Sequence, residues 1–279
     1  MKNLIARRTV LLGMGQAATF GSVLAVLPRL AEAGQAAAPA QKVVLTMLYP
    51  SEGGHSFDAD AFRDRHLPLL KNSYGPAVER IELRVAPPPP PPPPVAEGEE
   101  APPAPPPPPV LAAVSIWLAS ISEFITRANN SARAIAADMA TITRSAPIVQ
   151  YDVVEGQAGE AASSIIGGAT VLSSYFFAPQ GEGAAEAKWD AEYFGKTYGP
   201  KIVETYGADA IQRVEVARGE LAQGGGKPLV LGAVHVYVKD ANAFDTAVAT
   251  DAVRALGAEA QQYSSVNPVT LVMNVFTAA

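Results

Sequence analysis

The chain has 279 residues, a formal net charge of −6 and no cysteine. Without cysteine it forms neither disulfides nor thiolate metal sites. The acidic balance disfavours nucleic acid and anionic membrane surfaces as partners, because both attract basic proteins. Once an N-terminal signal is set aside, roughly 245 residues remain, which suits two domains of about 100 residues.

The pattern of residues 1–33 indicates an export signal, which is not part of the fold. The pair Arg7-Arg8, followed by apolar residues, resembles the twin-arginine pattern, and Ala31-Glu32-Ala33 offers a cleavage site. Glycines dilute the apolar stretch, which argues against a stable membrane span. We therefore expect a periplasmic or secreted protein without a membrane partner after cleavage; the alternative is an uncleaved anchor.

The next segment, residues 42–155, predicts a unit with the element order β-α-β-β-α-β. Its second strand alternates, with Ile81 and Leu83 on one face and Arg80, Glu82 and Arg84 on the other, which predicts a half-buried strand. The predicted strands are 43–49, 79–85, 111–118 and 148–154, and the predicted helices are 58–73 and 122–143.

A proline-rich insertion, residues 87–109, interrupts this unit between its second and third strands and holds most of the 25 prolines. Proline runs adopt extended polyproline II and cannot join a sheet. We expect a stiff, exposed excursion outside the core. Two roles stay open for it, a tolerated surface insertion and a ligand for a partner's aromatic groove.

A second unit, residues 169–277, repeats the element order after a glycine-rich linker, residues 157–168. Each unit is a split βαβ, the ferredoxin-like arrangement, so the predicted class is α+β. One sheet face of each unit has no helix to cover it, and we expect the two faces to bury each other. The predicted strands are 170–177, 212–217, 229–238 and 269–276, and the predicted helices are 190–206 and 241–256.

One twelve-residue stretch occurs in both units, as FDADAFRDRHLP at 57–68 and WDAEYFGKTYGP at 189–200. The two copies align without a gap, which indicates a duplicated domain. Each copy reads as a helix start, and the proline that closes it must kink or end that helix. His66 and Tyr198 stand just before the proline, where a side chain can point away from the core. We expect His66 to face a cavity; the alternative is an ordinary half-buried or exposed residue.

The uncovered sheet faces indicate where a ligand would bind. His235 and Tyr237 share the uncovered face of the strand at 229–238, and Ser115 and Trp117 hold the matching positions in the first unit. A face that mixes aromatic rings with histidine and serine suits a lined pocket. The alternative is a core between two sheets with a satisfied histidine.

The chain resembles the EthD family of small dimeric α+β barrel proteins. The resemblance rests on Leu48-Tyr49-Pro50, on F-D-x3-F-x3-H-x-P from Phe57 to Pro68, and on the strand that ends at Leu83-Arg84. It implies that two ferredoxin-like units pair their sheets into a barrel with a pocket inside, here within one chain. The second unit has Tyr198-Gly199-Pro200 where the family usually has histidine.

The resemblance implies a small, mostly apolar organic ligand, because such proteins are associated with oxidative breakdown of organic compounds. Cofactor-free monooxygenases and lactone isomerases belong to the same superfamily. We therefore expect a cofactor-free oxidoreductase or isomerase with His66 as general acid or base. Tyr198 would assist catalysis, and the other four side chains would bind the substrate: Ser115, Trp117, His235 and Tyr237.

Three alternatives stay open beside this expectation. The protein could bind its ligand without turnover, or act as an accessory protein. A haem-binding barrel is less favoured, because no GxxDG-like peroxidase motif occurs in the sequence. We expect no cofactor and no metal, and a homodimer of the whole chain is left open.

Overall fold

A computed structural model describes residues 42–87, 107–161, 168–181 and 186–278. The predicted signal and nearly all of the predicted proline-rich insertion lie outside the described residues. Within the described residues, no helix is long and apolar enough to cross a membrane.

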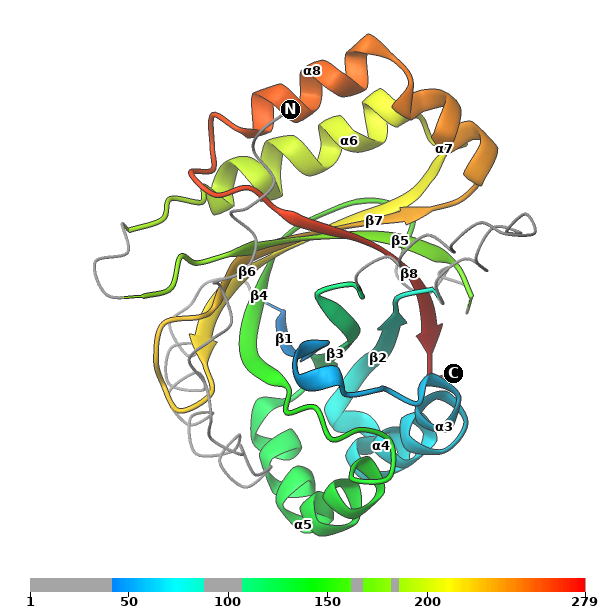
Figure 1. Cartoon of the computed structure of the whole chain (residues 1–279), viewed down its shortest axis with the longest axis vertical. Coiled ribbons are helices and arrows are strands. Elements are labelled where there is room, and N and C mark those ends of the chain that lie inside the picture. Colours follow the sequence, from blue (N-terminus) through cyan, green and yellow to red (C-terminus); the bar gives the residue numbers. More distant parts are fainter. Residues whose placement is uncertain (1–41, 88–106, 162–167, 182–185, 279) are drawn as a thin grey trace, which may run out of the picture.

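Eight antiparallel strands close a barrel in the order β1-β3-β2-β8-β5-β7-β6-β4 (Figure 1). The first half of the chain contributes β4-β1-β3-β2 and the second half β8-β5-β7-β6, which is the same order. The halves meet where β2 pairs with β8 and β4 with β6. A single chain therefore closes the barrel, as predicted. The strands are Val43–Pro50 (β1), Val78–Val85 (β2), Val110–Leu118 (β3), Ile148–Gly159 (β4), Thr170–Phe177 (β5), Ile211–Ala222 (β6), Val230–Val238 (β7) and Val269–Thr277 (β8).

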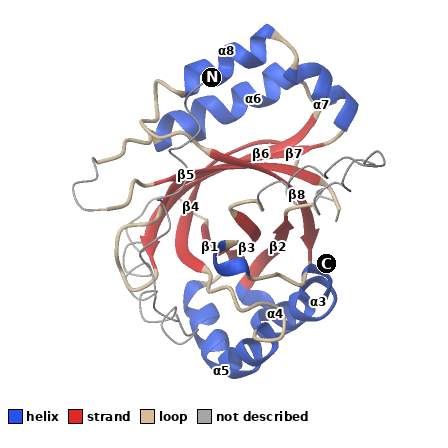
Figure 2. Cartoon of the chain, in the orientation of Figure 1, coloured by secondary structure: helices blue, strands red, loops and turns tan. Residues whose placement is uncertain are grey.

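Helices cover the outside of the barrel in two layers, one for each half (Figure 2). The helices of the first half are Ala59–Ala61 (α3), Leu67–Tyr74 (α4) and Ile121–Met139 (α5), and those of the second half are Gly199–Tyr206 (α6), Ala241–Val248 (α7) and Asp251–Ala260 (α8). The predicted helix at 241–256 is thus two helices. They separate because the hydroxyl of Thr250 accepts a hydrogen bond from the Val253 backbone N–H and starts a new helix.

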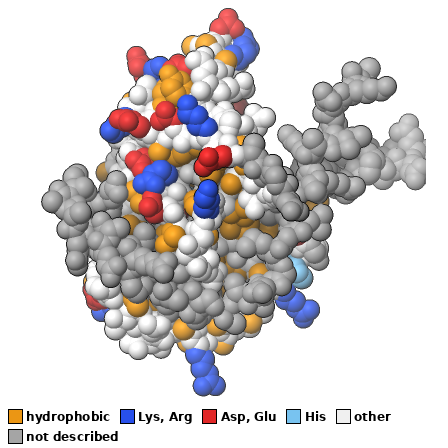
Figure 3. Space-filling model, turned by 90° about the vertical axis from the view of Figure 1, so that its left-hand side faces the viewer, with side chains coloured by type: hydrophobic (Ala, Val, Ile, Leu, Met, Phe, Trp, Pro, Cys, Tyr) orange, Lys and Arg blue, Asp and Glu red, His pale blue; other side chains and the backbone are white. Residues whose placement is uncertain are grey.

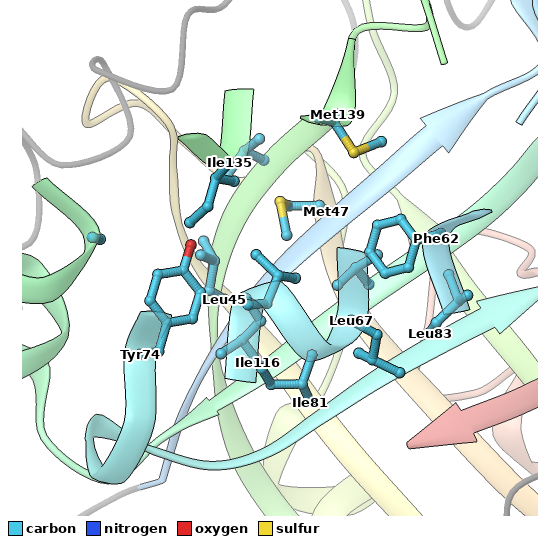
Figure 4. Packing of buried hydrophobic residues seen from close by; sticks show 14 of the residues in the cluster. Leu45, Met47, Phe62, Leu67, Tyr74, Ile81, Leu83, Ile116, Ile135 and Met139 are labelled. Carbon is cyan, nitrogen blue, oxygen red and sulfur yellow. The ribbon is translucent and has the colours of Figure 1, made fainter. Parts of the chain in front are cut away.

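The apolar faces of the strands pack against these helices and form a core outside the barrel wall. Burying such faces is the main force that holds each helical layer on the sheet. Figure 4 shows this packing in the first half, where the sheet contributes Leu45, Met47, Ile81, Leu83 and Ile116, and the helical segments contribute Phe62, Leu67, Tyr74, Ile135 and Met139.

The repeated twelve-residue stretch folds the same way in both halves. A π-helical turn, Phe62–His66, precedes α4, and its closing bond runs from the Leu67 N–H to the Phe62 carbonyl. A second π-helical turn, Tyr193–Tyr198, precedes α6. The proline of each copy then falls in the first turn of the following helix, a position that tolerates proline. The predicted break at the proline therefore takes the form of a π turn, and the chain stays helical.

The outer surface carries charges of both signs. Figure 3 shows acidic and basic side chains close together in the upper part of that view, over the helices of the second half. Exposed pairs such as Lys196–Glu192, at 3.0 Å, contribute little to stability because water screens them. The charges that matter for the site lie inside the barrel.

Candidate functional site

The prediction that β2 is half-buried is wrong, because its charged face is buried as well as its apolar face. Glu82 and Arg84 are both fully buried, and their strand turns them into the barrel. Strand β6 does the same with Arg213 and Glu215. The interior cluster, as we call it, consists of inward-facing polar side chains from two pairs of adjacent strands, β2 with β3 and β6 with β7, and one serine from β5. Its members are Arg80, Glu82, Arg84, Ser115, Trp117, Ser173, Arg213, Glu215, His235 and Tyr237.

Glu82 is one centre of the interior cluster. Its Oε2 atom accepts a hydrogen bond from the Tyr237 hydroxyl at 2.8 Å and lies 3.2 Å from the Arg84 Nη2 atom. Its Oε1 atom lies 2.9 Å from Arg80 Nε. A carboxylate taken out of water needs such partners, because burying an unpaired charge is costly. Burial and the nearby Glu82 carboxylate raise the pKa of Tyr237 well above its usual value, so the phenol keeps its proton.

His235 lies between Arg84 and Ser173. Arg84 Nη1 is 3.0 Å from the Nε2 atom of the ring, and Ser173 Oγ is 3.0 Å from its Nδ1 atom. Arg84 Nη1 also lies 3.2 Å from Nδ1, and since arginine only donates, one ring nitrogen of the imidazole accepts its hydrogen bond. Burial, followed by the charges of Arg84 and Arg80, lowers the pKa of His235 well below its usual value. The imidazole is therefore neutral at neutral pH.

Glu215 is the second centre of the interior cluster. It accepts hydrogen bonds from Trp117 Nε1 at 3.0 Å, from Gln157 Nε2 at 2.9 Å and from Arg213 Nη2 at 3.2 Å. The Arg80 guanidinium lies 3.5 Å from the centre of the Trp117 ring and 3.1 Å from Glu215 Oε2. Arg80 thus joins the two glutamate centres, one in each half of the chain.

Strand register shows that the two halves place equivalent residues at these centres. Arg80 pairs with Trp117 on β3, and Arg213 pairs with Tyr237 on β7. In the same way Glu82 pairs with Ser115, and Glu215 with His235. The arginine–glutamate pattern is therefore common to both halves.

Other interior positions differ between the halves. Arg84 pairs with Ala113 on β3, and Ala217 pairs with Ala233 on β7. The position that holds an arginine in the first half therefore holds an alanine in the second. Asp152 and Met273 are likewise matched, because each pairs with the corresponding valine of β1 or β5. The first half thus adds charged groups where the second half is apolar.

Asp152 is a buried carboxyl that sequence reasoning missed. Gln150 Nε2 donates a hydrogen bond of 2.5 Å to its Oδ1 atom. Burial raises its pKa to about 6, against the lowering effects of Thr46, Gln150 and Arg84. A carboxyl group with such a pKa can take up and release a proton near neutral pH, as general acid–base chemistry requires.

An apolar wall completes the barrel interior. Its side chains come from both halves and include Leu48, Val110, Val171, Leu271, Met273 and Val275. Tyr175 belongs to the same cluster and is buried, and its hydroxyl has no hydrogen-bond partner among the described residues. The interior therefore has a polar part and an apolar part in contact with each other.

Four of the six predicted site residues lie in the interior cluster: Ser115, Trp117, His235 and Tyr237. His66 lies elsewhere, in the layer between helices and sheet. Its ring is 1% exposed, lies 4.7 Å from the Phe62 ring, and has Nδ1 2.7 Å from Asp138 Oδ2 on α5. Burial lowers the pKa of His66, while the bond to Asp138 opposes that shift. His66 thus differs from the expected cavity-facing residue, because its ring is packed between a phenylalanine and a carboxylate.

Tyr198 occupies the corresponding place in the second half. It is half-buried on the helical side of the sheet, with its ring 5.2 Å from that of Phe194. Burial, with smaller effects of Tyr206 and Glu259, raises its pKa to about 12. His66 and Tyr198 therefore belong to opposite helical layers, and the structure does not bring either into the interior cluster.

A surface depression of about 340 Å³ lies next to α4, on the outside of the barrel. Its walls come from α4, the preceding π turn and the end of β8, and His66 is not one of its lining residues. They are Arg63, Leu67, Pro68, Lys71, Asn72, Thr277 and Ala278. Across the described ranges, no group of three or more histidine, aspartate or glutamate side chains is arranged to hold a metal ion.

No family model matches the chain, and a search of curated proteins finds no match either. Solved structures do match. The structure of an anthrone oxidase-like protein aligns with a TM-score of 0.51 and 12% identity, over 85% of this chain and 92% of that one. The two proteins share a fold. At this identity the likeness concerns the fold alone, an α+β structure with an eight-stranded antiparallel barrel.

Two further similar structures come from named bacteria. An EthD-like protein from Ralstonia eutropha has 23% identity and a TM-score of 0.31, over 40% of this chain and 89% of its own. A variant of chlorite dismutase from Candidatus Nitrospira defluvii has 10% identity and a TM-score of 0.42, over 85% of this chain and 92% of its own. The solved structures similar to this chain thus include an EthD-like protein.

Proposed function

We propose that this chain binds a small organic molecule inside its barrel. The observation that carries the proposal is the interior cluster, in which both halves of the chain bring buried charges together. A barrel of this kind does not need those charges to close, because the second half has alanine and methionine where the first has Arg84 and Asp152. Well-packed apolar residues are often at least as stable as buried ion pairs. The charges are therefore best explained by a ligand.

The two parts of the interior define the kind of ligand. The interior cluster offers hydrogen-bond donors and charges, and the apolar wall beside it offers hydrocarbon surface. Small-molecule sites commonly combine a mostly apolar lining with a few placed polar groups. A mostly apolar molecule with one polar end fits this arrangement.

We further propose that the two halves are ferredoxin-like units of the EthD type, at residues 42–155 and 169–277. The equal strand orders and the π-helical turn common to both halves support this origin. Arg7-Arg8 and the cleavage site at Ala31-Glu32-Ala33 support export through the twin-arginine route. Sequencing the N-terminus of protein recovered from a periplasmic fraction tests export directly; intact residues 1–33 on a cytoplasmic protein would contradict it.

A cofactor-free oxidoreductase or isomerase is the catalytic form of this proposal. Asp152 favours it, because a buried carboxyl with a pKa of about 6 can exchange a proton with a bound substrate near neutral pH. His235 is a weaker candidate for a base, since its accepting nitrogen already faces Arg84. Binding without turnover is the alternative, and loss of turnover with retained binding in Asp152→Asn separates the two.

The interior residues do not fit a haem. His235 is the histidine that the described part of the chain places inside the barrel, and its Nε2 atom lies 3.0 Å from the Arg84 guanidinium. An iron at that nitrogen would meet a buried cation. His66 lies outside the barrel, bonded to Asp138. We therefore assign no step to haem.

Tryptophan fluorescence tests the proposed function. The chain has two tryptophans, Trp117 in the interior cluster and Trp189 on the helical side. In Trp189→Phe the remaining emission reports on the interior. We expect a saturable change in that emission with at least one member of a panel of small aromatics and lactones. If Trp117 emission responds to none of them, while the protein is folded, the proposed function is wrong.

A further inference from the structure

Tyr175 has a buried hydroxyl group without a hydrogen-bond partner among the described residues. Its side chain is 1% exposed, and its oxygen has no hydrogen-bond partner among the described residues. A buried hydroxyl without a partner costs free energy, because it has lost its bonds to water. Leu48 holds the matching position in the first half, as it pairs with Ala113 where Tyr175 pairs with Ala233. The barrel therefore accepts an apolar side chain at this place.

The hydroxyl-bearing ring lies beside the polar part of the interior. Its centre is 5.6 Å from that of His235, in an edge-on arrangement. Arg84 contacts the same imidazole, with Nη1 3.0 Å from its Nε2 atom, so His235 lies next to both the Tyr175 ring and the guanidinium.

Arg84 and Tyr175 also lie at the same level of the barrel. Arg84 pairs with Ala113, and Tyr175 pairs with Ala233, and these alanines are equivalent positions of the two halves. At each of these positions the other half of the chain has an apolar residue. Ala217 is equivalent to Arg84, and Leu48 is equivalent to Tyr175. Each of these two departures from symmetry adds a hydrogen-bond donor to the same layer of the barrel.

The Arg84 guanidinium has one N–H donor that is not used by the described residues. Arg84 bonds to Glu82 and Ser115 through Nε and Nη2, and its Nη1 atom lies 3.0 Å from Nε2 and 3.2 Å from Nδ1 of His235. A neutral imidazole accepts one hydrogen bond, so the second N–H of Nη1 has no acceptor within the described residues. An unpaired phenol and a spare guanidinium N–H in one layer suit an acceptor group with negative charge.

We propose that Tyr175 and Arg84 form an oxyanion subsite that binds the carboxylate of a small apolar acid. This inference rests on the proposed function, since the ligand enters the same barrel interior. The carboxylate would accept one hydrogen bond from the phenol and one from the guanidinium. The hydrocarbon part would lie on the apolar wall, which includes Val110, Val230 and Val275. The short side chains of Ala113 and Ala233 border the same layer.

Benzoate and benzamide are the probes, because they have the same shape and differ in charge. In the Trp189→Phe protein we expect benzoate to bind at least tenfold more tightly than benzamide. Tyr175→Phe in that background should weaken benzoate tenfold or more. The control is Tyr49→Phe, which removes a buried phenol hydroxyl on the helical side, where it contacts Met139. Benzoate affinity should not change in that variant.

The possible failures are distinguishable. If benzamide or another neutral probe binds and benzoate does not, the oxyanion subsite is refuted and the proposed function stands. If Tyr175→Phe binds benzoate as tightly as its parent, the phenol has no part in recognition and the inference is refuted. If no probe changes Trp117 emission, both proposals fall. Thermal melting of Tyr175→Phe checks that the variant is folded, and we expect a melting temperature no lower than that of the parent.

Discussion

Replacing Asp152 with asparagine removes a buried charge and should stabilise the protein at neutral pH. Burial raises the pKa of this carboxyl from 3.8 to about 6, so the folded protein holds the proton more tightly than the unfolded chain. A group with a raised pKa contributes stability below its unfolded pKa and loses it as the pH rises through the folded pKa. At pH 7 a shift of roughly two units corresponds to about 3 kcal/mol.

Asparagine keeps an oxygen for the hydrogen bond from Gln150 and has no charge to desolvate. We expect Asp152→Asn to be more stable than the parent by about 1 to 3 kcal/mol at pH 7, with the difference vanishing near pH 4. Urea unfolding at pH 4, 5.5 and 7 measures it. The control is Asp64→Asn, which removes an exposed carboxylate beside Arg63 and should change little. A pH-independent loss of stability in Asp152→Asn would refute the reasoning.

Three further predictions concern stability and are measured by urea unfolding. His66→Ala should lower the free energy of unfolding by about 2 to 3 kcal/mol, because it removes a buried hydrogen bond to the Asp138 carboxylate. Unchanged stability would show that His66 has no structural role and would favour a functional one. Gly156→Ala should cost about 3 kcal/mol, because its Cβ would lie 1.9 Å from a backbone oxygen, whereas Gly257→Ala in an exposed helix should gain about 1 kcal/mol. Tyr237→Phe should lower the free energy of unfolding by about 1.5 to 3 kcal/mol, because the Tyr237 hydroxyl donates a hydrogen bond to the buried Glu82. Tyr175→Phe should change that free energy by less than about 0.5 kcal/mol, because the Tyr175 hydroxyl has no partner among the described residues. Equal losses in the two variants would contradict this difference between the hydroxyls.

The strand pattern and its closure could be predicted because they depend on alternation and on the need to cover apolar faces. All eight strands lie close to their predicted places, and β5 agrees at both ends. β4 and β6 both run further than predicted, to Gly159 and Ala222, because they keep pairing with each other beyond the end of their apolar alternation. The extended pairing is a property of two strands together, so it is not visible in either one alone.

The strand at 79–85 was predicted to be half-buried and is buried on both faces, although the sequence contained the signal. Arg80-Ile81-Glu82-Leu83 and Arg213-Val214-Glu215-Val216 repeat one pattern at matching places in the two halves. Alternation of apolar and charged residues usually means that one strand face lies in water. In a closed barrel the face opposite the helices is the interior, so the same alternation places the charges inside.

The position of His66 could not be predicted because a π turn changes the phase of the helix. One extra residue in a turn rotates every following side chain by about 100°. The proline at position 68 indicated a break but not its form. The rotation brings His66 against Asp138 of α5 and away from the barrel.

A crystal structure of the protein with a ligand found by the fluorescence screen tests the central claim most directly. Ligand density should lie inside the barrel, within hydrogen-bonding distance of Arg84 or another member of the interior cluster, and against the apolar wall. Density in the surface depression beside α4, at Arg63 and Lys71, with an interior unchanged from the ligand-free protein, would contradict it.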